Sequence, residues 1–211
     1  MSENPISKTR FPKLKEKARD RYLTEDERMR LFNVARQHAP YIVPILQYAM
    51  LVPCRLSELV NLRRENYDTF TNTLFIPDSK AGIPIHKQIP EEMKEYFRSI
   101  PTGCPWIFYR KDENRQYHQL KVFRRTFRTC LRKAEIHNFK FHDTRHISAS
   151  DLYAAGNSER AIMDIAGWKT PMLTTYRHKD SLQSAIGIHF QESRNLEKKV
   201  LKGYTHKVAE S

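Results

Sequence analysis

Cysteine and glycine are both scarce in this chain of 211 residues, and long apolar runs are missing altogether. The 3 cysteines, Cys54, Cys104 and Cys130, are widely spaced and form no C-x-x-C pair. Their spacing argues against a disulfide framework or a cysteine zinc cluster, and it favours a reducing compartment. The 6 glycines argue against Gly-rich low complexity. No run approaches the roughly 20 apolar residues that span a bilayer, so we expect no membrane partner.

Acidic residues are too few to balance the basic ones. The chain has 37 Lys and Arg against 24 Asp and Glu, which gives a formal net charge of +13. A surplus of this size in one domain favours a polyanionic partner, with nucleic acid as the first candidate. On charge alone, a basic protein of a ribosome or of a membrane surface stays open. The polar N-terminus lacks the apolar core of a signal peptide, so we expect a cytoplasmic, nucleoid-associated location or the interior of a host cell.

The composition divides the chain into three segments. Residues 1–23 contain prolines and many basic residues without a helical period, which is typical of a basic linker or arm, or of a disordered tail. Residues 24–180 carry the periodic patterns of a folded domain. Residues 181–211 carry an amphipathic helix followed by a polar tail. We therefore expect one folded domain with an extension at each end.

Helical periods dominate the folded domain. Thr24 and Glu27 have the spacing of a capping box before the first helix. After a break at Pro53, the chain restarts as a short helix. The remaining helices are predicted over about 41–51, 116–134, 143–155, 158–166, 171–178 and 182–201. Only residues 66–90 differ, because β-branched and aromatic residues replace the helical period there.

Residues 66–90 predict a small antiparallel sheet. Ile83, Ile85, Lys87 and Ile89 occupy alternate positions, as they would on one face of a strand. A Lys-Ala-Gly turn is expected at 80–82, between two of the strands. The predicted fold class is therefore mainly α with a small antiparallel β-sheet.

The predicted helix over about 116–134 has two contrasting faces. Its apolar stripe consists of Leu120, Phe123, Phe127, Leu131 and Ala134. Its basic face consists of Lys121, Arg125, Arg128 and Arg132. A basic face is often only solvated, but nine Lys and Arg stand against two acids between residues 110 and 133. This excess favours contacts with phosphate, so we expect the four basic residues to bind DNA.

Several polar or aromatic residues stand where predicted elements begin or end. They are Arg55, Lys80, His142, Arg145, Trp168 and Tyr176. His142 and Arg145 are three positions apart at a helix start, so they can share one face. Taken singly, each residue has an ordinary structural explanation: Arg55 could pair with Glu58, His142 could cap its helix, and Trp168 could belong to the core.

Three sequence boxes together resemble a known family. "CRLSELVNL" resembles the R-x-S-E-L box of the tyrosine recombinases (the phage integrase family), and "HDTRH" matches their H-x-x-R-H box. "AGWKTPMLTTYRH" resembles the box that carries their tyrosine. The hairpin lysine, Lys80, falls between the first two boxes, as it does in the family. The resemblance covers roughly residues 20–195 and implies the mainly helical catalytic-domain fold of these enzymes.

The resemblance also implies a role for each residue. Arg55 and Arg145 would hold the non-bridging oxygens of a scissile DNA phosphate, supported by His142 and Trp168. Tyr176 would attack phosphorus and form a 3′-phosphotyrosyl bond, while Lys80 would protonate the leaving 5′-oxygen. Two accessory residues complete the set: Glu58 would position the site, and His146 is expected to be a structural residue buried beside Arg145.

The implied chemistry agrees with the physical properties of these groups. Two guanidiniums match the oxygens of a phosphodiester and neutralise charge in the transition state. The same cations lower the pKa of a nearby phenol, which is otherwise about 10. The covalent intermediate retains the energy of the phosphodiester, so neither ATP nor a metal is needed and no cofactor is expected. The expected partner is double-stranded DNA.

The resemblance further implies a homo-tetramer on DNA, and accessory DNA-bending proteins are further candidate partners. Residues 181–211 would pack on a neighbouring protomer or fold back on their own domain. The function implied is that of a site-specific recombinase of the integrase or excisionase type, with residues 24–180 as its catalytic domain.

Three alternatives stay open. A type IB topoisomerase uses related chemistry to nick and reseal one strand. A DNA-binding relative without catalysis is favoured by the eight positions between Trp168 and Tyr176, because nine are usual in the family. A zinc enzyme is conceivable because His142 and His146 are spaced i, i+4, but no third ligand is evident.

Overall fold

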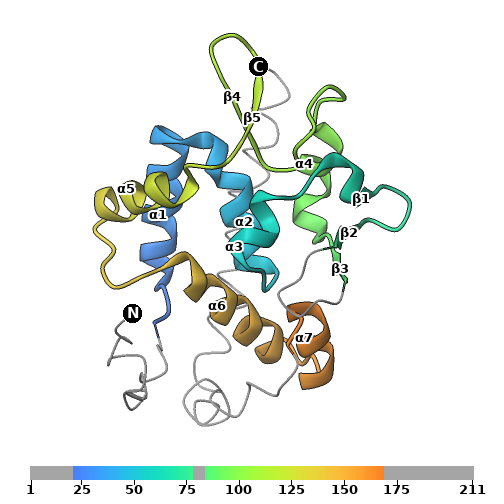
Figure 1. Cartoon of the computed structure of the whole chain (residues 1–211). Coiled ribbons are helices and arrows are strands. Elements are labelled where there is room, and N and C mark those ends of the chain that lie inside the picture. Colours follow the sequence, from blue (N-terminus) through green and yellow to red (C-terminus); the bar gives the residue numbers. More distant parts are fainter. Residues whose placement is uncertain (1–20, 78–83, 169–211) are drawn as a thin grey trace, which may run out of the picture.

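Helices surround a buried central helix, with a small sheet on one side (Figure 1). The computed structural model of the chain describes residues 21–77 and 84–168. In chain order the elements are α1 (Glu25–His38), η2 (Pro40–Ile42), α2 (Val43–Leu51), α3 (Leu56–Val60), η3 (Arg64–Asn66), β1 (Tyr67–Asp68), β2 (Thr73–Ile76), β3 (Ile85–Gln88), η4 (Glu91–Met93), α4 (Lys94–Ser99), β4 (Tyr109–Lys111), β5 (Tyr117–Gln119), α5 (Phe123–Lys133), α6 (Phe141–Ala154) and α7 (Glu159–Ala166). The prediction of a mainly helical fold with a small antiparallel sheet is confirmed.

The core centres on α2, which is buried on all sides from Val43 to Met50. Its sequence, VPILQYAML, is apolar at nearly every position, as expected for a helix without a solvent face. Helix α6 packs against α2, and α1 contacts both α2 and α5. Tyr48 of α2 packs its ring against Phe97 and Phe108, so the same core extends to α4 and the segment after it. Helix α6, which carries the H-x-x-R-H box, is thereby held against the centre of the domain.

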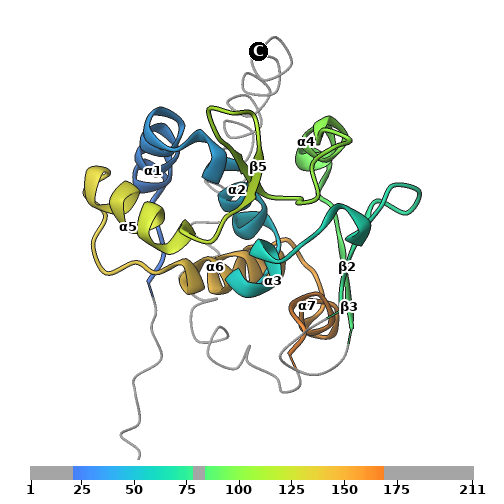
Figure 2. The ribbon, with the colours of Figure 1, turned by 45° about the horizontal axis from the view of Figure 1, so that its top comes forward.

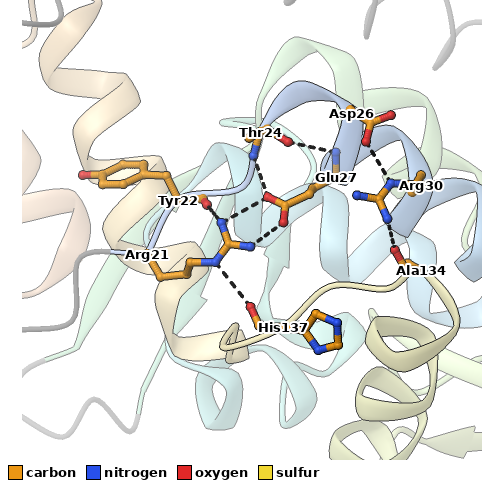
Figure 3. A network of polar contacts seen from close by, with 8 residues as sticks. All are labelled: Arg21, Tyr22, Thr24, Asp26, Glu27, Arg30, Ala134 and His137. Carbon is orange, nitrogen blue, oxygen red and sulfur yellow. Dashed lines mark hydrogen bonds and ion pairs between the residues drawn. The ribbon is translucent and has the colours of Figure 1, made fainter.

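The predicted capping box at the start of α1 is confirmed. Thr24 Oγ1 accepts a hydrogen bond from the Glu27 amide at 3.2 Å, and Glu27 Oε2 accepts one from the Thr24 amide at 2.9 Å. The carboxylate of Glu27 also binds the guanidinium of Arg21, whose Nε donates to the carbonyl of His137 at 3.3 Å (Figure 3). The hydrogen bonds and ion pair to Arg21 lower the pKa of Glu27. The Glu27 carboxylate therefore caps the N-terminus of α1 and, through Arg21, links this helix to the loop between α5 and α6.

Three further long-range contacts hold α1 in place. Arg30 Nη1 donates to the carbonyl of Ala134 at 2.5 Å, beside the contact of Arg21 (Figure 3). Arg28 pairs with Asp151 of α6 at 3.3 Å. The hydroxyls of Tyr22 and Ser150 lie 2.7 Å apart. The contacts of Arg28 and Tyr22 therefore hold α1 and the residues before it against α6.

The sheet has the order β1-β2-β3, and both pairs are antiparallel. Leu74 pairs with Lys87, and Ile76 pairs with Ile85, on the face that is buried. Strand β3 contacts α7, so this face of the sheet covers the end of that helix (Figure 2). The predicted turn at 80–82 lies outside the described residues.

The prediction of a helix over about 116–134 is wrong for its first residues. Residues 117–119 form strand β5, which pairs with β4 in a hairpin, and α5 begins only at Phe123. The rings of Tyr109 and Tyr117 meet edge to face with centroids 5.3 Å apart, and the side-chain amide of Gln119 donates to the carbonyl of Val60 at 3.1 Å. These tertiary contacts override the helical period. All five residues of the predicted apolar stripe are nevertheless buried, although Leu120 precedes α5 and Ala134 is its C-cap.

Helices α6 and α7 follow the prediction closely. The Ser158 hydroxyl accepts a hydrogen bond from the Ala161 amide at 3.2 Å, which caps α7. Gly167 ends α7 in the left-handed conformation, with φ +66° and ψ +44°. The helices predicted at 171–178 and 182–201 lie outside the described residues. No helix in the described part of the chain is long and apolar enough to cross a bilayer.

Candidate active site

Arg145 lies on the first turns of α6 and is almost completely buried, with 2% of its surface exposed. Its Nη2 donates to the carbonyl of Ala166, the last residue of α7, at 2.6 Å. Its guanidinium carbon lies 5.3 Å from the centroid of the Trp168 ring. Because the carbonyls at a helix C-terminus carry partial negative charge, they are favourable partners for a cation. The end of α7 and the indole therefore hold this guanidinium in one orientation.

Arg55 immediately precedes α3 and is oriented by Glu58. Arg55 Nη1 lies 2.7 Å from Glu58 Oε1, and the Arg55 amide donates to Glu58 Oε2 at 3.0 Å. The Glu58 side chain is 1% exposed, whereas that of Arg55 is 23% exposed. The pair that offered an ordinary explanation for Arg55 is therefore present, with the carboxylate inside the protein and the guanidinium partly open to solvent. Arg55 can contact a ligand while Glu58 fixes its position.

Lys87 of β3 is fully buried between the segment that precedes Arg55 and the end of α7 that holds Arg145. Its Nζ donates to the carbonyl of Pro53 at 2.8 Å and to that of Ile165 at 2.6 Å. It also lies 3.9 Å from Glu58 Oε2, and its side chain is 0% exposed. The site thus contains three cations, Arg55, Lys87 and Arg145, and one carboxylate, Glu58. This surplus of positive charge suits an anionic ligand.

His142 lies one turn before His146 on α6. His142 is exposed at the surface and His146 is half-buried, and their rings meet nearly at right angles with centroids 5.3 Å apart. The pKa of His142 is lowered, first by desolvation and then by the charges of His146 and Arg145, with a smaller effect of Arg55. A neutral imidazole at pH 7 can still donate one hydrogen bond.

The expectation that His146 is buried beside Arg145 is only partly met, because its ring is half-buried and packs on His142. The zinc alternative gains no support in the described ranges: no group of three His, Cys, Asp or Glu side chains there is arranged to hold a metal ion.

Cys54 is buried in the same region, directly before Arg55. Burial raises the pKa of its thiol to about 11, although the nearby charge of Lys87 acts in the opposite direction. The thiol is therefore neutral at physiological pH. It adds no negative charge that would compete with a phosphate for the arginines.

Trp168 is half-buried at the end of α7, next to Gly167. Its amide donates to the carbonyl of Met163 at 3.0 Å, so the chain is fixed as it leaves the helix. Lys80 and Tyr176, the predicted proton donor and nucleophile, lie outside the described residues. The structure thus brings together Arg55, Glu58, Arg145 and Trp168, with His142 near both arginines.

The predicted DNA-binding residues form a separate group: Arg125, Arg128 and Arg132 lie on α5, whereas Lys121 lies in the turn before that helix. All four are exposed: Lys121, Arg125, Arg128 and Arg132. Phe123 and Phe127 on the opposite face pack their rings against Phe141, the first residue of α6. Figure 1 shows α5 and α7 on opposite sides of α6. The basic face of α5 is therefore exposed, and a ligand bound at the arginine cluster could extend to it.

Lys87 is the residue of the site that the sequence patterns did not single out. A signal was nevertheless present, because Lys87 occupies the same strand face as Ile85 and Ile89, and all three are buried. A lysine on the apolar register of a strand needs buried acceptors, since an unpaired buried charge is very unfavourable. Its acceptors belong to segments 34 and 78 positions away in the sequence.

The chain matches the family model described as "Phage integrase family" over residues 21–182. It is 25% identical over 177 residues to the shufflon-specific DNA recombinase of Escherichia coli, covering 83% of this chain and 44% of that protein. It is also 25% identical over 194 residues to the integrase of Salmonella phage P22, covering 84% of this chain and 48% of that protein. The chain thus spans about half the length of these relatives.

The fold is similar to that of solved integrase structures. One is a lambda integrase tetramer bound to a Holliday junction, with a TM-score of 0.61 and 19% sequence identity. The similarity covers 82% of this chain and 53% of that one. At this identity the likeness concerns the fold, and it agrees with the arrangement of helices and small sheet described above.

Proposed function

The chain belongs to the phage integrase family, and from this premise we propose that it is a site-specific DNA recombinase acting through a 3′-phosphotyrosine intermediate. The observation that carries the proposal is the buried network that connects Arg55 with Arg145 through Glu58, Lys87 and the end of α7. Two guanidiniums held rigidly by one network suit the oxygens of a single phosphodiester.

The strand exchange begins with the phenol of Tyr176. The phenol loses its proton to solvent, its oxygen attacks the phosphorus, and the bond from phosphorus to the 5′-oxygen breaks. Lys80 gives a proton to that oxygen, so a free 5′-hydroxyl and a 3′-phosphotyrosyl bond result. In the reverse direction, a 5′-hydroxyl of another strand attacks the phosphotyrosine and releases the phenol.

The two arginines bind the non-bridging oxygens and neutralise the charge that grows on them. Because Arg145 is held by the Ala166 carbonyl and the Trp168 ring, little reorganisation is needed when the transition state forms. Glu58 plays the same part for Arg55. His142 and Trp168 contribute N–H donors to the phosphate, and His146 supports the ring of His142.

The proposed reaction is independent of metal and ATP. The arginines supply the charge that a metal would otherwise supply. The phosphotyrosyl bond keeps the energy of the phosphodiester, so rejoining needs no external energy.

Double-stranded DNA is the proposed substrate, and a homo-tetramer is the proposed assembly. One structural relative is a tetramer on a Holliday junction, and four exposed basic residues on α5 and directly before it are suited to the DNA backbone. In this proposal residues 1–23 are a basic linker or arm, 24–180 form the catalytic domain, and 181–211 pack in cis or on a neighbouring protomer. Accessory DNA-bending proteins are candidate partners.

The test is a covalent capture experiment. The protein is incubated with a library of nicked duplexes of randomised sequence in EDTA without ATP, and complexes that survive denaturation are sequenced. Wild type is expected to yield adducts with a common sequence, and Tyr176→Phe is expected to yield none. Tyr204→Phe is the matched control and should react like wild type.

Three results would contradict the proposal. Adducts that persist in Tyr176→Phe would exclude this nucleophile, and sequence-selective binding without any adduct would indicate a DNA-binding relative that has lost catalysis. Relaxation of supercoiled DNA without exchange between the captured sites would indicate a topoisomerase instead.

A further inference from the structure

Lys87 is the fully buried lysine of the site, and its position on β3 is unusual for a charged residue. Its side chain is 0% exposed, so it cannot contact DNA. A lysine ammonium has three protons and no acceptor capacity. Two of them are donated to the carbonyls of Pro53 and Ile165, and the carboxylate of Glu58 lies at 3.9 Å. Each of these three partners is a neighbour, in sequence or through a hydrogen bond, of a group that holds Arg55 or Arg145.

One side of this arrangement leads to Arg55. Pro53 is two residues before Arg55, and the carbonyl of Pro53 accepts from Lys87 at 2.8 Å. Glu58, the carboxylate beside Lys87, uses its other oxygen to hold the Arg55 guanidinium at 2.7 Å. Lys87 therefore contacts both the backbone before Arg55 and the acid that orients its side chain.

The other side leads to Arg145. The carbonyl of Ile165 accepts from Lys87, and the next carbonyl along α7, that of Ala166, accepts from Arg145, each at 2.6 Å. The same helix end packs closely on β3, since a Cβ added at Gly167 would lie 2.3 Å from Ile85 Cδ1. Lys87 and Arg145 are thus bound to adjacent carbonyls of one helix terminus.

We propose that Lys87 is a positioning residue that sets the separation and orientation of Arg55 and Arg145 on the scissile phosphate. It does so by joining the segment before α3 to the C-terminus of α7 through one buried ammonium. The inference rests on the proposed recombinase function. It gives Lys87 a role distinct from that of Lys80, which acts on the leaving oxygen, because Lys87 acts only through other residues.

A positive charge at this position has a physical reason. Two arginines close together repel each other, and Glu58 alone neutralises only one of them. An apolar residue at 87 would leave two buried carbonyls and one buried carboxylate with fewer donors. Lys87 satisfies these acceptors and keeps the cluster positive before DNA binds. Its removal should therefore disturb geometry around both arginines.

The first experiment needs no DNA, so it is independent of the proposed function. The chain has 2 tryptophans, Trp106 and Trp168, and Trp106→Phe leaves Trp168, beside Arg145, as the only tryptophan, which is excited selectively over tyrosine. In this background, Lys87→Met is expected to raise the acrylamide quenching constant of Trp168 by about twofold, because the α7 end loosens from β3. Lys87→Arg, which keeps the charge and donors, should restore part of the change. Lys94→Met removes a half-buried lysine that pairs with Glu91 at the start of α4, and it should change nothing.

The second experiment measures cleavage of a DNA captured by the wild-type protein. Lys87→Met is expected to lower the single-turnover rate at saturating DNA by about a hundredfold while changing Kd less than about threefold. Lys87→Arg should recover at least about tenfold of the rate, and Lys94→Met should match wild type. A residue that served stability alone would change the fraction of folded protein and leave the rate per folded molecule unchanged.

Unchanged cleavage and unchanged Trp168 quenching in folded Lys87→Met would overturn the proposal. If Lys87→Met does not fold, Glu58→Gln combined with Lys87→Met removes both charges and is compared with Glu58→Gln alone. An additional loss of about tenfold in rate supports the proposal, and equal rates overturn it. If wild type forms no adduct, the proposed function fails, and the quenching result still decides whether Lys87 positions the end of α7.

Discussion

Arg145 donates its Nη2 proton to the carbonyl of Ala166 at 2.6 Å, and this contact joins the H-x-x-R-H helix to the end of the next helix. The two residues are 21 positions apart in the sequence. The contact fixes the guanidinium before any ligand arrives, and the Trp168 ring covers it. A side chain held in this manner is suited to stabilise a transition state more than a ground state.

Arg145→Ala should therefore lose cleavage far more than affinity. The expected loss in single-turnover rate on a captured DNA is about 10²–10³-fold, with a change of only a few fold in Kd. Arg132→Ala on α5 is the matched control, since it should weaken binding and leave the rate at saturating DNA nearly unchanged. Equal losses of rate and affinity in Arg145→Ala would assign it to binding alone.

The basic face of α5 should control the salt dependence of DNA binding. Each phosphate contact releases counterions, so removing one exposed arginine should reduce the slope of log K against log[salt] by about 1. Arg125→Ala, Arg128→Ala and Arg132→Ala are compared with Arg98→Ala, an exposed arginine of α4. Fluorescence anisotropy over a salt series measures the slopes. A similar slope in all four variants would remove α5 from the interface.

Gly167→Ala should destabilise the protein for two separable reasons. Its φ of +66° is unfavourable for alanine by about 1–2 kcal/mol, and its new Cβ would meet Ile85 Cδ1 at 2.3 Å. Gly156→Ala is the control, because Gly156 also has a positive φ, +86°, but has open space around it.

Urea unfolding should show a larger loss of the free energy of unfolding in Gly167→Ala than in Gly156→Ala. Ile85→Val removes the clashing Cδ1 and should recover the difference in the double variant. A double variant that recovers nothing would show that the contact with β3 is unimportant.

His142 should make stability depend on pH. Its folded-state pKa is below its ordinary value, so the unfolded chain binds a proton more readily than the folded one. Stability must then fall as pH decreases from the unfolded pKa, about 6.5, through the lower folded value. His142→Gln should lose part of this decline between about pH 7 and 5, measured by urea unfolding at each pH. An identical decline in both proteins would contradict the desolvation assigned to His142.

The local features of the fold could be predicted from the sequence because their causes lie within a few residues. Thr24 and Glu27 cap α1 across three positions, and Ser158 and Gly167 bound α7 by the same short-range rules. The burial of Phe123, Phe127 and Leu131 on one face of α5 follows from helical spacing. The candidate site residues could be identified from the sequence for a related reason, since each box is a short contiguous stretch.

Other features depended on residues that are distant in the sequence. The segment at 117–119 pairs with β4 and donates to Val60, so its helical period did not decide its structure. The role of Lys87 depends on Pro53 and Ile165, which only the folded chain brings together. The sequence by itself determined the caps of α1 and α7 and most of the helices that the structure describes, because these follow from local conformational preferences. Only the tertiary structure decided how Arg55 and Arg145 are linked, because a buried ammonium takes whichever acceptors the packed core supplies.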